Sequence, residues 1–381
     1  MELFLRDLTR ELAVAHDVTV LTQGTDTGPR SALVESVLQP PAFDAFLDGA
    51  VNVEPLRIPA RQRAALAPLA AHTAPVLRRY AWGSARVAAT RRYARHVAPL
   101  IAERARGCDV VHVWGAGLLG AAAVEAAQTL DVACVFTPFA HRGQWGDDAA
   151  AAATYRRCDR IVALLEADAR LYRELGVEPE RIATCGVCSP GVPAADGGAI
   201  RRRHGIDGPL VLFLGRRTPY KGADLLLRAA LNLPEVTFAF LGPGERLSPP
   251  AGARIIDVGP VDERARAEWL DAADLLALPS AAEIFPVSIL EAWSVGTPVL
   301  VSEIEPLREL ADGGGAVAVP RDVDAITQAL RELLSDGEAL RGLGEAGRER
   351  WRASFAPAAV AEAHVRVYDG VLEREGIACV A

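Results

Sequence analysis

Residues 210–224 read LVLFLGRRTPYKGAD: an apolar run, a glycine-led loop and the start of a helix. Five consecutive apolar residues predict a strand covered on both faces, as in a parallel sheet. The loop carries Arg216 and Lys221, and a helix is expected to begin near Gly222. Cations beside a helix N-terminus, at the carboxyl end of a strand, suit an anion such as pyrophosphate. The alternative is a surface loop with ordinary basic residues.

The alternation of strand and helix continues on both sides of this stretch. Strands are expected at 18–22, 109–113, 132–136, 160–164, 210–214, 237–241, 254–258, 275–278, 298–301 and 316–319. Helices are expected at 2–13, 120–129, 224–231, 263–272, 287–295 and 324–334, with a final helix at 357–381. Glycine and proline are dense in 189–208, which predicts a linker. The expected fold class is α/β, with two Rossmann-like domains and a cleft between them, where ligands bind at the carboxyl ends of the strands.

Composition excludes several classes of protein. Half of the 381 residues are hydrophobic, which favours packed domains over a disordered chain. No uncharged apolar run reaches ~18 residues, and the first residues form no signal peptide, so no membrane span or leader is expected. Six scattered cysteines indicate reduced thiols and a cytoplasmic location. The net charge of −8 argues against a nucleic-acid partner.

The basic residues are unevenly distributed. Lys221 is the only lysine among 41 basic residues, either by chance or because its chemistry resists the bias toward arginine. The segment 56–107 holds eleven arginines and one acidic residue, Glu103, interleaved with apolar and aromatic side chains. This pattern predicts basic amphipathic helices that make a peripheral contact with an anionic membrane or bind an anionic acceptor. The alternative is a solvated arginine face.

A second stretch, 279–299, reads PSAAEIFPVSILEAWSVGTPV. Glu283 lies in the loop after an expected strand, and Pro286 suits the first position of the following helix, where its missing N–H costs nothing. Glu291 falls on the second turn of that helix. Carboxylates placed there can accept hydrogen bonds from sugar and ribose hydroxyls. The alternative is a pair of solvated glutamates at a helix end.

Together the two stretches resemble the retaining GT-B glycosyltransferases of family four, the glycosyltransferase group 1. The shared motifs are a Gly-Arg-x4-Lys-Gly loop and then Glu-x7-Glu, followed by Ala, Gly and Pro. The resemblance extends to 258–261, 273–275 and 315–320, and more loosely to the first half. It implies an acceptor-side domain at 1–188, a nucleotide-sugar domain at 209–356, and a last helix that packs back on the first domain.

The resemblance also implies a reaction. A sugar would move from a nucleotide-diphosphate donor, UDP- or GDP-linked, to an acceptor hydroxyl with retention of configuration and with neither a metal nor a cofactor. Arg216 and Lys221 would contact the diphosphate in place of a metal ion, Glu291 the ribose and Glu283 the sugar. The implied donor-binding set is Gly215, Arg216, Lys221, Val261, Glu283, Phe285, Val287, Ser288 and Glu291.

In the first half, the loop after the strand at 132–136 resembles the family's histidine loop, which places His141 against the donor sugar. The alternative is a loop histidine bonded to backbone. His112 is expected to be structural. Three weaker patterns are read as structural: Cys185 and Cys188, the helix cap at 322–324, and the incomplete dinucleotide fingerprint at 242–244, which argues against a dehydrogenase.

Two features depart from the family. Pro286 stands where the family usually has glycine, which leaves the identity of the donor open. The strand and Gly-Gly loop with which the family begins are not in the sequence, so we expect either a misplaced start or an inactive, truncated relative that binds nucleotide sugar or acts as a scaffold. A sugar-nucleotide epimerase is disfavoured, because the Arg/Lys loop and the glutamate pair follow the transferase pattern.

Overall fold

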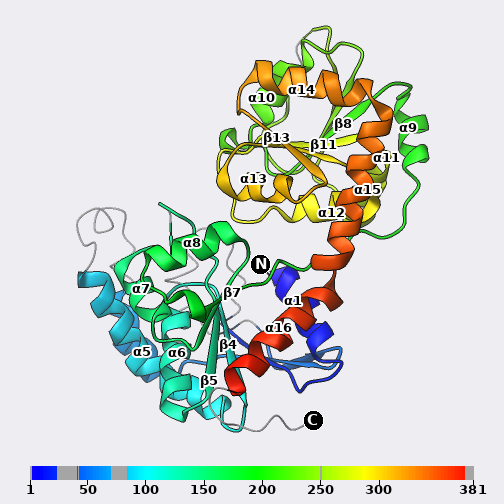
Figure 1. The fold of residues 1–381 in the computed structure, drawn as a ribbon. Helices are drawn as coiled ribbons and strands as arrows, with labels where there is room; N and C mark the ends of the chain where they lie inside the picture. The colour runs from blue at the N-terminus through cyan, green and yellow to red at the C-terminus, as the bar shows by residue number, and fades with distance from the viewer. Residues whose placement is uncertain are drawn as a thin grey trace. The chain divides into compact units, whose positions relative to one another are not determined.

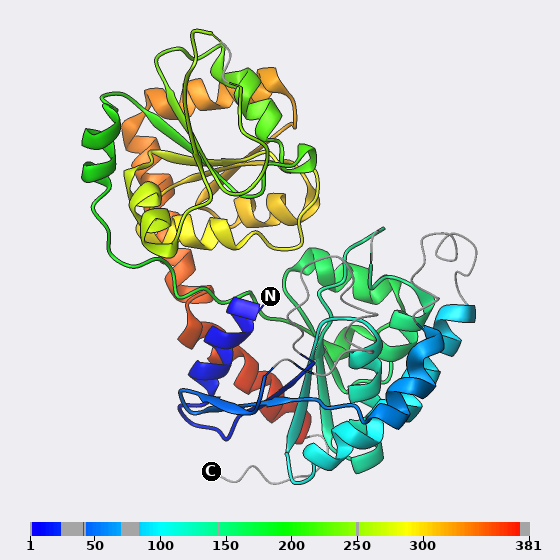
Figure 2. The ribbon, with the colours of Figure 1, turned by 180° about the vertical axis from the view of Figure 1, so that it is seen from behind.

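A computed structural model describes residues 2–23, 41, 43–69, 84–143, 145–248 and 251–373. The chain divides into two compact units, Met1–Cys185 with Ala361–Ala381, and Gly186–Val360 (Figures 1 and 2).

The second unit is built on a six-stranded, all-parallel sheet. Its strands are β8 (Leu210–Leu214), β9 (Thr237–Leu241), β10 (Arg254–Gly259), β11 (Leu275–Leu278), β12 (Val299–Ser302) and β13 (Ala316–Val319). They lie in the order β10-β9-β8-β11-β12-β13. Strand β8, the first of this unit along the chain, is therefore central, and the order reverses between β8 and β11. The predicted strands of this half are confirmed to within a residue, because buried parallel strands are continuous apolar runs.

Helices cover both faces of this sheet. Figure 1 shows α10 (Ala223–Ala230) and α14 (Val323–Ser335) on one face, and α12 (Val287–Val295) on the other. The further helices of the unit are η3 (Pro219–Lys221), α11 (Glu263–Ala272), α13 (Glu305–Asp312) and α15 (Gly337–Ser354). The hydrophobic core between the sheet and α10 contains Phe213, Leu226 and Phe238, all fully buried.

The segment expected to be a linker, 189–208, contains helix α9 (Gly197–His204). Its first amide, Gly197 N, donates to the Asp271 carboxylate on α11 at 2.8 Å, and its Arg201 pairs with Asp274 at 2.5 Å. Asp196 caps the helix by accepting from Ala199 N. These contacts place α9 within the second unit, although its glycines are typical of a connection.

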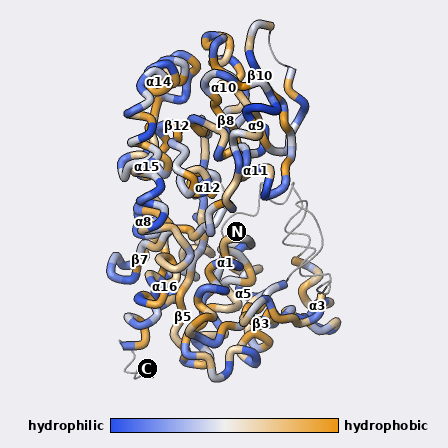
Figure 3. The backbone as a smooth tube through the Cα atoms, turned by 90° about the vertical axis from the view of Figure 1, so that its right-hand side faces the viewer, coloured by the Kyte–Doolittle hydropathy of each residue, from blue (hydrophilic) through white to orange (hydrophobic). Residues whose placement is uncertain are grey.

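The first unit holds two sheets. One is parallel, in the order β4-β5-β6-β7: β4 (Val110–Trp114), β5 (Ala133–Thr137), β6 (Arg160–Ala163) and β7 (Ile182–Thr184). The other has the order β1-β3-β2: β1 (Thr19–Thr22), β2 (Phe46–Asp48) and β3 (Val51–Pro55). Figure 3 shows β5 as mostly hydrophobic: its first four residues are apolar, and all five residues, including the polar Thr137, are buried. The predicted strands are confirmed, whereas β2, β3 and β7 are short and were not predicted.

Seven helices and a 3-10 turn complete the described part of the first unit: α1 (Glu2–Leu12), α3 (Ala60–Leu66), α5 (Ser84–Arg104), α6 (Leu118–Leu130), α7 (Ala149–Tyr155), α8 (Glu166–Glu174), η2 (Pro179–Arg181) and most of α16 (Pro357–Leu372). From Ala361 onward α16 belongs to this unit, and Tyr368 bonds His112 of β4 at 2.7 Å. The predicted helix at 357–381 is thus observed over 357–372.

Helix α5 is amphipathic, as the arginine-rich segment predicts. Tyr93, Val97 and Ile101 are buried against α6, and the arginines at 91, 92 and 95 are exposed. Arg86 pairs with Asp148 at 3.2 Å. Arg78 and Arg79 of the arginine-rich segment lie outside the described residues.

Candidate functional site

The two sequence motifs meet at the carboxyl ends of β8 and β11. These strands are neighbours, and they flank the point where the strand order reverses. In open parallel sheets, ligands bind at such a switch point, because the loops leaving the two strands diverge to opposite faces. The loops are 215–221 and 279–286, so the chain places both motifs where this rule expects a ligand.

An ion pair joins these loops. Lys221 Nζ lies 2.5 Å from Glu283 Oε1, and the two side chains are only 20% and 8% exposed. A partly buried pair attracts more strongly than a solvated pair, because less water screens it. The structure therefore brings together the two residues that the family resemblance assigns to the diphosphate and the sugar.

Main-chain contacts hold the same two loops in register. Ala281 N donates to the carbonyl of Tyr220 at 2.6 Å. Arg321, which follows β13, donates to the carbonyl oxygens of Pro279 and Pro219 at 3.0 and 2.9 Å. Glycine is required at position 222, because the residue has φ +77° and a Cβ there would lie 2.2 Å from the Pro279 carbonyl oxygen. The absence of a side chain at Gly222 allows the two loops to approach this closely.

Arg216 and Arg217 are adjacent but have different surroundings. Arg216 is exposed, and its Nη2 donates to Tyr220 Oη at 2.8 Å. Arg217 is 5% exposed, pairs with Asp257 at 2.6 Å and donates to the Gly242 carbonyl. Arg217 is thus committed to joining β8, β9 and β10, and Arg216 remains accessible to a ligand.

The glycine that precedes them is held close to the neighbouring loop. Gly215 N donates to the Leu241 carbonyl at 3.0 Å. A Cβ at Gly242, which has φ +121°, would lie 2.1 Å from the Gly215 carbonyl, so only glycine fits there. The partial fingerprint at 242–244 therefore has a packing explanation.

Glu291 lies on the second turn of α12 and pairs with Arg266 of α11 at 3.3 Å. Its side chain is 13% exposed, and burial raises the pKa of its carboxyl, an effect that Arg266 opposes and Glu263 reinforces. Arg266 Nε is buried and has no hydrogen-bond partner among the described residues. The ribose-binding candidate is thus a partly desolvated carboxylate held by one arginine.

The remaining donor-site candidates lie around α12 and α11. Pro286 is the N-cap residue and the helix begins at Val287, so the prediction that Pro286 takes the first helical position is wrong by one residue. Val287 is 39% exposed, and Ser288 is half-buried beside it. Phe285 packs against Phe355, with ring centroids 5.6 Å apart. Val261 is half-buried in the turn between β10 and α11.

His141 belongs to the first unit, in the loop after β5. Its backbone pairs with that of Trp145 through two hydrogen bonds, and its Nδ1 lies 3.3 Å from the Arg142 carbonyl. Phe139, two residues earlier, has φ +53°, which is unusual for a bulky residue and marks a constrained loop. His141 as a whole is half-buried.

His112 sits inside the same unit. Its two ring nitrogens bond Tyr368 Oη at 2.7 Å and Thr137 Oγ1 at 2.9 Å. Burial, with His364 nearby, holds the pKa of His112 well below its usual range. Both nitrogens are used in packing α16 against β4 and β5, so His112 has a structural role.

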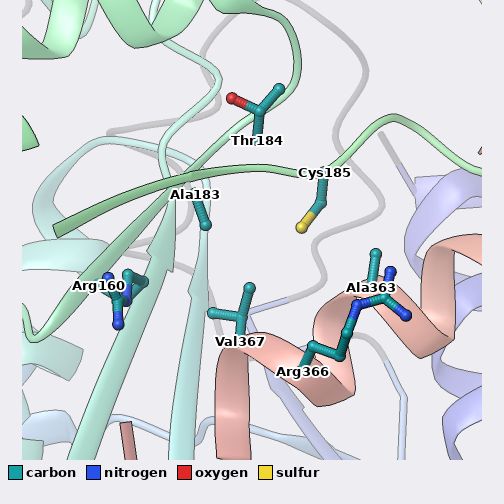
Figure 4. A pocket seen from close by; sticks show the side chains of 7 residues that line it. All are labelled: Arg160, Ala183, Thr184, Cys185, Ala363, Arg366 and Val367. Carbon is teal, nitrogen blue, oxygen red and sulfur yellow. The ribbon is translucent and has the colours of Figure 1, made fainter. Parts of the chain in front are cut away.

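A small cavity of about 280 Å³ lies between β6, β7 and α16 (Figure 4). Arg160 and Arg366 line it, and Figure 4 shows their side chains directed away from each other. Arg366 pairs with Glu362 at 2.9 Å, and Arg160 bonds the Glu180 carbonyl. Cys185, in its wall, has a pKa raised to about 11 by burial, and is an unreactive thiol.

Within residues 2–373, apart from the gaps given above, no group of three or more His, Cys, Asp or Glu side chains is placed to hold a metal ion. In the same part of the chain, no helix combines the length and apolarity needed to cross a bilayer.

Models of two domain families match the chain. The glycosyl transferase 4-like domain matches residues 1–187, and the group 1 glycosyl transferases match residues 208–336. The solved sucrose-phosphate synthase of Thermosynechococcus elongatus superposes with a TM-score of 0.69 at 18% identity, over 98% of this chain and 93% of that one. Anabaena HepE in complex with UDP-glucose gives a TM-score of 0.70 at 15% identity, covering 97% and 95% of the two chains. The fold is GT-B, and the chain belongs to the group 1 glycosyltransferases.

Curated relatives cover part of the chain. A D-inositol 3-phosphate glycosyltransferase of Thermobispora bispora is 34% identical over 247 residues, which are 57% of each protein. A protein of the same name from Mycobacterium leprae is 34% identical over 160 residues, 37% of each. The matched part of this chain therefore spans at most 57% of the length of these two relatives.

Three residues at the site were not predicted from the sequence: Tyr220, Arg266 and Arg321. Tyr220 lies beside Lys221 in the quoted loop, and that position was its only signal. The partners of Arg266 and Arg321 are 25 or more residues away along the chain, so no local pattern could pair them.

Proposed function

We propose that this protein is a retaining, metal-independent glycosyltransferase that moves a sugar from a UDP- or GDP-linked donor to an acceptor hydroxyl. The observation that carries the proposal is the Lys221–Glu283 pair at the switch point, with the exposed Arg216 beside it. Two cations at the end of a parallel strand can neutralise the negative charge of a pyrophosphate, as a bound metal ion does in other enzymes.

Each proposed role follows from the chemistry of the residue. Arg216 and Lys221 bind the diphosphate and stabilise the negative charge that grows on it as the bond to the sugar breaks. Glu291 accepts hydrogen bonds from the ribose hydroxyls, which requires the ionised carboxylate that Arg266 favours. Glu283 accepts from hydroxyls of the transferred sugar. For His141, in the first unit, a role toward the donor sugar is proposed from the family resemblance alone.

The proposed reaction breaks the bond from the anomeric carbon to the phosphate oxygen and forms a bond to the acceptor oxygen on the same face. The acceptor proton passes to the leaving phosphate, so no protein nucleophile is required. The other members of the donor set, Gly215, Val261, Phe285, Val287 and Ser288, would surround the nucleotide and sugar.

The acceptor is proposed to be anionic. The arginines exposed on α5 support this proposal, and the relatives are named for D-inositol 3-phosphate, a phosphorylated polyol. The same surface supports a peripheral contact with anionic lipid, which would weaken as salt screens the arginines.

A screen of nucleotide sugars tests the function. Purified protein is incubated with each UDP- and GDP-sugar in EDTA, and donor hydrolysis or a mass shift on candidate acceptors is measured. Turnover of one donor in the presence of the chelator supports the proposal. Binding without any turnover would indicate an inactive sugar-nucleotide-binding homologue, and activity that returns only with magnesium or manganese would refute metal independence.

A further inference from the structure

Tyr220 occupies a distinctive position between the two cations of the proposed donor site. Its hydroxyl accepts a hydrogen bond from Arg216 Nη2 at 2.8 Å, and Lys221 Nζ lies 5.3 Å from the centre of its ring. Its backbone carbonyl accepts from Ala281 N at 2.6 Å, in the loop that carries Glu283. One residue therefore contacts both cations and the loop of the carboxylate that pairs with one of them.

Arg216 and Lys221 differ in how strongly the free protein already holds their side chains. Arg216 is exposed, and a free arginine side chain has many rotamers, so fixing it on a ligand costs conformational entropy. A partner that already holds the guanidinium lowers that cost before the ligand arrives. Lys221 needs less help, because it is 20% exposed and already paired with Glu283.

We propose that Tyr220 is a positioning residue for the donor diphosphate, which pre-orders Arg216 through its hydroxyl and supports Lys221 through its ring. The inference rests on the function proposed above. Tyr220 itself is 38% exposed, so it is accessible at the surface of the loop and is not needed to fill the core.

The two contacts can be separated by substitution. Tyr220→Phe removes the hydroxyl and keeps the ring, so it releases Arg216 alone. Tyr220→Ala removes both contacts. Because the backbone bond to Ala281 N does not depend on the side chain, both variants are expected to fold, which their melting temperatures would establish.

The experiment is a double-mutant cycle measured by isothermal titration of the full chain with UDP and GDP. Tyr220→Phe should weaken binding of the preferred nucleotide about two- to tenfold, the range for releasing one rotamer-rich side chain. In an Arg216→Ala background, Tyr220→Phe should have no further effect, whereas Tyr220→Ala should still weaken binding through Lys221. Arg331→Ala, on the surface of α14, is the control for loss of an arginine and should bind as the wild type does.

Unchanged affinity in Tyr220→Phe, or the same loss with and without Arg216, would overturn the positioning role while leaving the proposed function standing. A wild-type chain that binds neither nucleotide would refute the proposed function, and this inference with it.

Discussion

Lys221 Nζ and Glu283 Oε1 lie 2.5 Å apart, although 62 residues separate them along the chain. The contact exists because β8 and β11 are adjacent parallel strands, so the loops that follow them both begin at the carboxyl ends of the strands. A cation and a carboxylate that are both largely buried depend on each other, since either alone would be a poorly solvated charge.

Replacing Lys221 should therefore affect stability and activity separately. Lys221→Met leaves the carboxylate of Glu283 without its cation, which should cost about 3 kcal/mol of unfolding free energy. The same variant should reduce donor turnover by about 10²–10³-fold, because a preorganised charge on the leaving group is lost.

The matched control is Lys221→Met combined with Glu283→Gln. The double variant carries no buried charge at this position, so urea unfolding should return most of the lost stability. Turnover should remain low. Wild-type turnover in the double variant would contradict the diphosphate role of Lys221.

Glu291→Gln should stabilise the protein at neutral pH. Burial raises the pKa of Glu291 above its ordinary value of 4.5, so the folded state holds this proton more tightly than the unfolded state. The wild type consequently loses stability as pH rises from about 4.5 through the folded pKa, and the variant does not.

Thermal unfolding between pH 4.5 and 7.5 measures this difference, which should favour the variant increasingly as pH rises. Glu345→Gln, exposed on α15, serves as the control for loss of a surface carboxylate. Nucleotide affinity should fall in Glu291→Gln and stay constant in the control. A variant less stable than the wild type at every pH would count against the desolvation argument.

Arg321→Ala should weaken donor binding from a distance. Its side chain ties Pro279 and Pro219, which precede Glu283 and Lys221 in their loops. Loss of both hydrogen bonds should cost about 1–2 kcal/mol and lower nucleotide affinity several-fold. Titration calorimetry of Arg321→Ala beside Arg331→Ala checks this; equal affinities would show that the two loops hold their register without Arg321.

His112 should make the first unit sensitive to mild acid. Its pKa is held well below the ordinary 6.5, so below that pH the unfolded chain takes up a proton that the folded chain does not. Stability should fall as pH drops from 7.5 to 5.5, and His112→Asn should flatten the profile. An unchanged slope in the variant would assign the acid sensitivity to other groups.

The strands of the fold could be predicted from the sequence because their burial is local information. Leu210–Leu214 and Leu275–Leu278 are apolar runs bounded by polar or turn residues, and the structure places them as predicted. The family resemblance assigned Lys221 and Glu283 to one donor site but did not predict that they pair with each other. Physically, their pairing depends on which strands are neighbours, and no local pattern encodes that.

The parts that could not be predicted have other causes. Strand β2 has only three residues, and in β3 the apolar residues are interrupted by Asn52 and Glu54, so neither strand forms the continuous apolar run that marks the predicted strands. Helix α9 lies in a glycine-rich segment, and it owes its place to Asp271 and Asp274, about 70 residues away. Arg217 and Arg216 are the same residue type side by side, so only their surroundings reveal which one is committed to packing.

A crystal structure of the full chain with UDP or GDP, whichever binds, would show whether Arg216 and Lys221 hold a nucleotide diphosphate at the switch point of the second sheet, as we propose. We expect the phosphates within hydrogen-bond distance of Arg216 and Lys221 and the ribose hydroxyls on Glu291. A nucleotide bound elsewhere, with all three side chains free of it, would refute the proposed donor site.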